Sequence, residues 1–166
     1  MDSTLPGTTS AASAARRRRR LTHRIQDGLR DLSIQMALLN HQVGMHLDLR
    51  DADLECLDLI SRHGPIGPTA LAKRAGMHPA TLTGVLDRLE RGNWVVRTPN
   101  PTDRRSVLVQ VVKERTAEIA HLFAAMNSAV DGICSDYDDA ELVLIADFLL
   151  RTSRAGRLAT DELADS

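Results

Sequence analysis

The sequence predicts a mainly α-helical fold that carries one small β-hairpin, and three patterns along its 166 residues predict it. The first is a pair of short helical stretches joined by a tight turn, over residues 68–89. The second is a pair of β-prone runs directly after them, and the third is a set of amphipathic helical stretches on both sides. Together they indicate a helix-turn-helix with a β-wing, flanked by N- and C-terminal helices that pair with another chain.

These patterns divide the chain into four parts. Residues 1–15 are rich in Ser, Thr, Ala and Gly and have no hydrophobic period, so we expect them to be disordered. Residues 16–50 are expected to form an N-terminal dimerisation helix with a basic start. Residues 51–112 are expected to form the winged helix-turn-helix domain, and residues 113–166 C-terminal dimerisation helices with an acidic tail.

Apolar residues at helical spacing predict the first long helix. They are Leu21, Ile25, Leu32, Met36, Leu39, Val43 and Leu47. An unbroken basic run, Arg16 to Arg20, precedes them. The run is either a solvated start of the helix or an arm that adds phosphate or minor-groove contacts.

A second helix is expected to follow. Asp51 is placed to cap it, Leu54, Leu57 and Ile60 form its apolar face, and His63-Gly64-Pro65 ends it.

The helix-turn-helix pattern begins at Pro68 and ends at Leu89. Ala72 is small enough for two helices to approach, Gly76 permits the turn, and Pro79 lies in the first turn of the second helix, where a missing N–H costs nothing. The buried stripe of that helix is Leu82, Val85, Leu86 and Leu89. Its outward face is then Ala80, Thr81, Thr83, Gly84 and Arg88.

The hairpin follows directly. Trp94–Thr98 and Val107–Val111 have strand composition, and Pro99-Asn100-Pro101-Thr102 between them forces a turn. Asp103-Arg104-Arg105 then lies near the tip of the hairpin. Because such a hairpin is too short to bury a core, its two arginines are available to an anionic partner.

Two further apolar stripes follow the hairpin, and the acidic stretch from Asp136 to Asp139 caps the second of them. The first stripe is Ile119, Leu122, Phe123, Met126, Val130 and Ile133, and the second is Leu142, Ile145, Leu149 and Leu150. These helices exceed what one small domain can cover. We therefore expect a second copy of the chain to cover them in a homodimer.

Charge is local rather than global. The net charge is −1, but residues 66–115 hold nine Lys and Arg against four Asp and Glu, a net charge of +5, whereas residues 116–166 have a net charge of −7. A basic middle segment is the composition of a surface that binds double-stranded DNA. Thr81 and Thr83 can contact base edges, and Arg88 can contact phosphates.

The stretch from about Leu54 to Val111 resembles the MarR family of winged-helix regulators, the multiple-antibiotic-resistance regulators. The resemblance is carried by Leu71-Ala72, by Asp87-Arg88-Leu89-Glu90 and by the Asp-x-Arg of the wing. It implies that Asp103 pairs with Arg105 and aims that guanidinium into the minor groove, with Arg104 near the backbone. The DNA-binding residues expected from pattern and resemblance together are Thr69, His78, Ala80, Thr81, Thr83, Gly84, Arg88, Asp103, Arg104 and Arg105.

Two positions depart from the family pattern. Asn93 occupies the usual glycine place after the recognition helix, and because Asn tolerates left-handed geometry we expect the turn to survive, with a shift of one residue allowed for. Val112 replaces the usual capping threonine, so we expect the next helix to begin late or to fray.

The resemblance also implies a dimeric repressor and a small, often aromatic or phenolic, ligand between the dimer helices and the reading head. Candidate ligand contacts at the end of the first helix are Met36, Asn40, His41, Met45 and His46.

Other function classes have little support. Neither an enzyme motif nor a cofactor or metal-ligand pattern is present, and no apolar run approaches the ~20 residues that cross a membrane. We expect a cytoplasmic protein without cofactors, because Cys56 and Cys134 fit a reducing compartment. Two alternatives stay open here: a thiol-based redox sensor that uses Cys56, and a winged helix that binds proteins.

Overall fold

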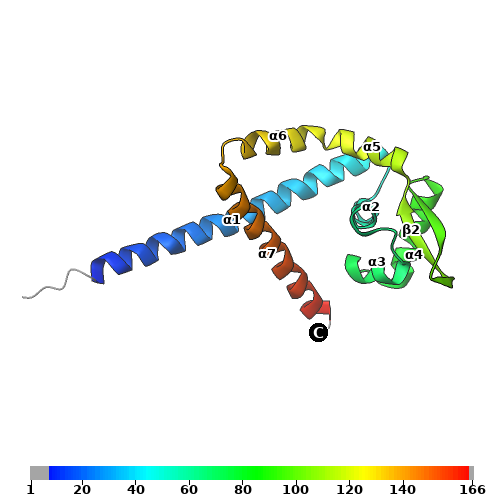
Figure 1. The fold of residues 1–166 in the computed structure, drawn as a ribbon, viewed down its shortest axis with the longest axis horizontal. Helices are drawn as coiled ribbons and strands as arrows, with labels where there is room; N and C mark the ends of the chain where they lie inside the picture. The colour runs from blue at the N-terminus through cyan, green and yellow to red at the C-terminus, as the bar shows by residue number, and fades with distance from the viewer. Residues whose placement is uncertain (1–7, 165–166) are drawn as a thin grey trace, which may run out of the picture. The chain divides into compact units, whose positions relative to one another are not determined.

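A computed structural model describes residues 8–164 of the chain, and their contacts separate two units, Met1–Gln42 and Val43–Ser166. The predicted fold class, mainly α with a small β-wing, is confirmed (Figure 1). The elements in order are α1 (Thr8–Leu47), α2 (Asp51–His63), α3 (Pro68–Ala75), α4 (Pro79–Arg91), β1 (Val95–Asn100), β2 (Asp103–Val111), α5 (Lys113–Leu122), α6 (Ala124–Cys134) and α7 (Asp139–Ala164).

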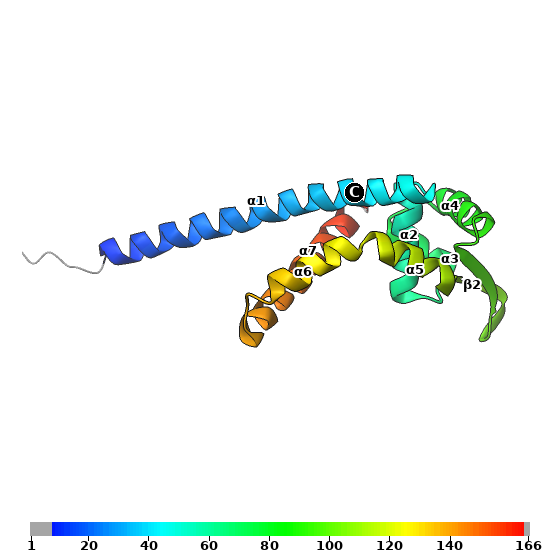
Figure 2. The same cartoon turned by 90° about the horizontal axis from the view of Figure 1, so that it is seen from above.

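Helix α1 is continuous from Thr8 to Leu47 (Figure 2). The expectation of disorder over residues 1–15 is therefore wrong for residues 8–15, while residues 1–7 lie outside the described part. Residues 8–15 contain four alanines and neither Gly nor Pro, and alanine has the highest helix propensity. The helix ends where Asp48 adopts a left-handed φ of 55° and the N–H of Leu49 donates to the carbonyl of Gly44 at 2.8 Å.

Helix α2 begins one residue earlier than the proposed cap requires. Arg50 is the N-cap residue and Asp51 is the first helical residue, so the prediction that Asp51 caps α2 is wrong. The capping carboxylate is that of Asp53, which accepts the backbone N–H of Arg50 at 3.2 Å. The predicted end of the helix is confirmed, since α2 ends at His63.

Helices α3 and α4 form the predicted helix-turn-helix. Gly76 ends α3 with a φ of 62°, and the N–H of Met77 donates to the carbonyl of Ala72 at 3.0 Å. Pro79 is the first residue of α4, as expected. The turn is therefore fixed by the one residue type that adopts this φ without steric cost.

The wing is an antiparallel pair in which Val95 faces Val111 and Thr98 faces Leu108. Asn93 adopts a left-handed φ of 57°, so the expected survival of the turn without glycine is confirmed. The chain then re-enters the domain at Trp94, whose N–H donates to the carbonyl of Leu89 at 2.8 Å.

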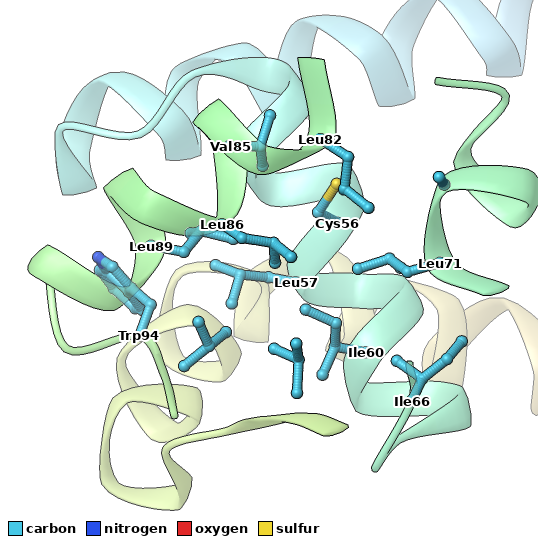
Figure 3. Close-up of a cluster of buried hydrophobic side chains, with 13 residues drawn as sticks. Cys56, Leu57, Ile60, Ile66, Leu71, Leu82, Val85, Leu86, Leu89 and Trp94 are labelled. Carbon is cyan, nitrogen blue, oxygen red and sulfur yellow. The ribbon is translucent and has the colours of Figure 1, made fainter. Parts of the chain in front are cut away.

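The core lies between α2, α3, α4 and the base of the wing (Figure 3). Its buried residues are Cys56, Leu57, Ile60, Ile66, Leu71, Ala72, Leu82, Val85, Leu86, Leu89, Trp94, Val95 and Val109. All four residues predicted for the α4 stripe are among them. The core thus fixes which face of α4 points outward.

The helices after the wing differ in part from expectation. Helix α5 starts at Lys113, immediately after Val112, so the expected late start is wrong even though Val112 makes no side-chain cap. The stripe expected over one helix is divided at Phe123 between α5 and α6. Helix α7 begins with reciprocal bonds, in which Glu141 N donates to Asp138 Oδ1 at 2.8 Å and Asp138 N donates to Glu141 Oε2 at 3.0 Å, so the predicted acidic cap is confirmed.

Candidate DNA-binding surface

The start of helix α4 presents small and hydroxylic side chains to solvent. Ala80, Thr81 and Thr83 are exposed, and Gly84 is half-buried. The hydroxyl of Thr83 donates to the carbonyl of Pro79 at 3.0 Å. The Thr83 side chain can therefore offer a partner the lone pairs of its hydroxyl oxygen and its methyl group. Thr69, in the first turn of α3, is exposed as well. A slim, polar helix start of this kind fits the width of a major groove.

His78 is the N-cap of α4. Its Nδ1 accepts the backbone N–H of Ala80 at 3.3 Å, and the side chain is exposed. The structure thus gives His78 a capping role at the N-terminus of α4, the helix that the sequence analysis expects to bind DNA.

Arg88 lies differently from expectation. Its guanidinium binds the carboxylate of Asp53, with Nη2 2.6 Å from Oδ1 and Nε 3.3 Å from Oδ2. The Asp53 side chain is 3% exposed and that of Arg88 30%, so the pair joins α4 to α2 in a largely buried position. Arg88 therefore does not point freely outward as expected, because its guanidinium neutralises a buried carboxylate. The expected contact of Arg88 with phosphates stays a prediction.

A second ion-pair cluster fastens the wing to α4, and the sequence analysis missed it. Arg97 of β1 places Nη2 2.6 Å from Asp87 Oδ1 and Nε 3.5 Å from Glu90 Oε2. Both carboxylates lie one turn apart on α4, and a basic residue in the first β-run was the available signal. Arg97 therefore links β1 of the wing to α4 through two ion pairs.

Side-chain hydrogen bonds shape the wing tip. The side-chain Oδ1 of Asn100 accepts the backbone N–H of Thr102 at 3.0 Å and the Thr102 hydroxyl at 2.8 Å. The side-chain Nδ2 of Asn100 donates to Ser106 Oγ at 3.0 Å. Asx turns of this kind stabilise tight reversals.

Asp103 supports Arg105 through the backbone. Asp103 Oδ1 accepts the N–H of Arg105 at 3.0 Å, whereas the resemblance implied a bond to the guanidinium. The Arg105 side chain is exposed, and that of Arg104 lies outside the described part of the chain. The tip is thus ordered by bonds among its own residues, and the Arg105 guanidinium is accessible to a partner.

Cys56 has the properties of a core residue. It is 0% exposed, and its Sγ lies 3.9 Å from Met77 Sδ. Burial, followed by the charges of Asp53 and Glu55, raises the pKa of the Cys56 thiol to about 11. A buried thiol that resists ionisation is a poor nucleophile, so the redox-sensor alternative is not favoured.

The candidate ligand residues lie at different places on α1. Met45, His41 and His46 are exposed, while Met36 and Asn40 are half-buried. A hollow of about 450 Å³ in the second unit includes His46 in its lining, together with Leu47, Ala117, Glu118, His121 and Leu122. Of the five predicted ligand contacts, His46 alone lines this hollow.

Among residues 8–164, no group of three or more His, Cys, Asp or Glu is placed to hold a metal ion. None of the described helices is long and apolar enough to cross a membrane.

Comparison with known proteins agrees with this architecture. Residues 49–107 match the model of the MarR family. The chain is 34% identical over 110 residues to the HTH-type transcriptional repressor NicR of Pseudomonas putida, covering 66% of this chain and 70% of NicR. It is 28% identical over 134 residues to YcgE of Bacillus subtilis, an uncharacterised HTH-type transcriptional regulator, covering 81% and 85% of the two chains.

Solved structures share the fold. Streptococcus pneumoniae FabT in complex with DNA has a TM-score of 0.62 at 19% identity, covering 80% of this chain and 95% of FabT. NadR in complex with 4-hydroxyphenylacetate has a TM-score of 0.60 at 22% identity, covering 77% and 91% of the two chains. The helix-turn-helix, the wing fastened to it and these similarities agree, and the chain belongs to the MarR family of DNA-binding transcriptional regulators.

Proposed function

We propose that the protein is a repressor that binds a pseudo-palindromic operator as a homodimer. The observation that carries the proposal is the geometry of the reading head: Arg97 of the wing forms an ion pair with Asp87 of α4, while Thr81 and Arg105 are exposed. In each head α4 would read the major groove and the wing would contact the minor groove. Two heads engage half-sites about one helical turn, roughly 10–10.5 bp, apart. The name of NicR supports the repressor role.

Unpartnered apolar side chains support the homodimer. In the described chain, large apolar residues are exposed along both terminal helices. Those of α1 are Leu21, Ile25, Leu32, Ile34, Leu38 and Met45, and those of α7 are Val143, Leu144, Ile145, Phe148, Leu149, Leu150, Leu158 and Leu163. Exposed apolar patches of this extent are typical of an interface.

Arg105→Ala is expected to weaken operator binding by about 1–3 kcal/mol, roughly tenfold to a hundredfold, because an exposed tip arginine contacts DNA without contributing to the core. Fluorescence anisotropy on the DNA upstream of the protein's own gene measures the change. Arg151→Ala, at an exposed position of α7, is the matched control and should leave affinity unchanged. Equal affinities of the wild type and Arg105→Ala would exclude the minor-groove contact.

We also propose that a small aromatic acid or phenol controls DNA binding from the hollow beside His46. The hollow lies between the end of α1 and α5. His46 and His121 in its lining offer donors to a carboxylate or hydroxyl. Its other lining side chains are largely apolar, as in most small-molecule sites. The complex of NadR with 4-hydroxyphenylacetate supports this class of ligand. A ligand there would alter the spacing of the two heads.

Addition of 4-hydroxyphenylacetate is expected to raise Tm and to lower DNA affinity, since a ligand that binds the folded state stabilises it. The effect should persist in a Cys56→Ala, Cys134→Ala variant, in which alanine avoids placing an unsatisfied hydroxyl in the core. Differential scanning fluorimetry and DNA titration measure both quantities. If mild peroxide releases DNA from the wild type alone and the ligand has no effect, control by a thiol replaces this proposal.

A further inference from the structure

The N-terminal part of α1 carries arginines that have no ion-pair partner within the described part of the chain. Arg16 to Arg20 and Arg24 are all exposed, and none of the ion pairs found among the described residues includes them. Six other arginines do face a carboxylate: Arg30, Arg62, Arg88, Arg97, Arg115 and Arg151. The first group is therefore a concentration of positive charge that the fold itself leaves uncompensated.

These arginines are not spread evenly around the helix. At about 100° per residue, Arg16, Arg17, Arg20 and Arg24 fall within an arc of about 100°. We call these four residues the arginine face. Arg16 and Arg20, and likewise Arg20 and Arg24, are four residues apart, so their like charges repel and oppose helix formation. A polyanion on this face would remove that repulsion.

The arginine face does not coincide with the apolar stripe of the same helix. Leu21, Ile25 and Leu32 lie about 140–180° around the axis from Arg16 and about 40–80° from Arg17. The stripe therefore borders the arginine face on the side of Arg17 and lies far from it on the side of Arg16. A partner chain that covers the stripe in the proposed homodimer would leave the Arg16 side of the face accessible.

Phosphates of DNA fit this face better than a lipid surface. A helix that lies on a membrane needs bulky apolar residues along the whole length opposite its basic face. Residues 8–20, which carry three of the four arginines of the face, contain only Thr, Ser, Ala and Arg, and bulky apolar residues begin only at Leu21. Arginine forks match phosphate oxygens, and the chain already belongs to a DNA-binding family.

We propose that the arginine face of α1 is a second phosphate-binding surface, which contacts the DNA backbone outside the bases read by α4. Its contribution is independent of sequence and sensitive to salt. The 28 residues from Arg20 to Leu47 span about 40 Å of helix. The inference rests on DNA binding by the family and on neither the repressor nor the ligand proposal.

The test uses the full chain with Arg16, Arg17, Arg20 and Arg24 all changed to Gln. Glutamine keeps helix propensity, and circular dichroism checks that it does. Binding to a 60-bp random-sequence duplex is measured by anisotropy between 50 and 300 mM KCl. The slope of log affinity against log salt should decrease in magnitude by about 3.6 per chain, because each of the four lost phosphate contacts removes about 0.9. Affinity at 100 mM KCl should fall at least tenfold.

Two controls separate this face from total charge. A variant with the same four arginines changed to Lys keeps the charge and should retain the slope of log affinity against log salt. A variant with Arg151, Arg154 and Arg157 changed to Gln removes charge from α7 and should also retain it. An unchanged slope in the four-glutamine variant, or an equal loss in the α7 control, would overturn the proposal.

Vesicles with 30% phosphatidylglycerol test the other anionic surface. If the wild type binds these vesicles, the four-glutamine variant does not, and the salt slope of DNA binding is the same for both, the face would be assigned to membranes. That result would also overturn the proposal. Arg105→Ala distinguishes a failure of the arginine-face proposal from a failure of the reading-head proposal. It should weaken operator binding in the wild type and in the four-glutamine variant alike.

Discussion

Arg88→Ala is expected to lower the free energy of unfolding by about 2–3 kcal/mol. Removing one partner of a fully buried ion pair costs about 3–5 kcal/mol, and the 30% exposure of the Arg88 side chain reduces that cost. Asp53 would retain the backbone N–H of Arg50 but lose its cation. Urea denaturation of the wild type and the variant measures the difference.

Position and charge can be separated with two further variants. Arg88→Lys restores the charge without the two-point bond, so it should recover part of the stability and not all of it. Arg91→Ala, at an exposed position one turn closer to the end of α4, removes the same charge away from Asp53 and should change stability by less than about 0.5 kcal/mol. Equal stability of Arg88→Ala and Arg91→Ala would show that the pair contributes little.

DNA binding by Arg88→Ala distinguishes the structural role from the contact first expected. A phosphate contact would make the salt slope about one unit shallower without affecting stability. The Asp53 pair instead predicts lower stability with a slope close to that of the wild type at temperatures where the variant is folded. The two roles therefore differ in both measurements.

The sequence was informative where one residue type or one helical period constrains the backbone strongly. Gly76, Pro79 and Asn93 are each constrained by their own backbone geometry, and the structure places all three as expected. The α4 stripe was predictable because a helical period selects one buried face. The cap at Asp138 follows the same logic, since the cap and its partner Glu141 are three residues apart.

The errors about side-chain partners lie where distant residues decide, whereas the errors about where α1, α2 and α5 begin are local. Arg88 and Asp53 are 35 positions apart, and no period or composition connects them. Asp51 was predicted as the cap of this helix, and no role was predicted for Asp53. Arg97 was missed for the same reason, because its partners lie on another element. For residues 8–15, polar composition suggested disorder while alanine propensity favoured a helix, and the helix formed.

Deletion of residues from Ala140 onward is expected to yield a monomer that still folds its reading head. No residue of α7 belongs to the hydrophobic core, which lies between Cys56 and Val109. The deletion removes all but the first residue of α7, whose side chains such as Val143 at 68% exposed and Leu144 at 70% contact little in the single chain. In the proposed homodimer, burial of this surface would contribute about 25 cal/mol per Å², which would make α7 a main source of dimer stability.

Sedimentation velocity at micromolar concentration, with thermal melting beside it, measures both consequences. The full chain should sediment as a dimer and the truncated chain as a monomer, or the truncated chain should aggregate through the exposed face of α1. Because two linked heads bind one operator with a high effective concentration, the monomer should also lose more affinity for a two-half-site duplex than for a single half-site. A full-length monomer with normal operator affinity would contradict both the dimer and the division of the chain into a reading head and dimerisation helices.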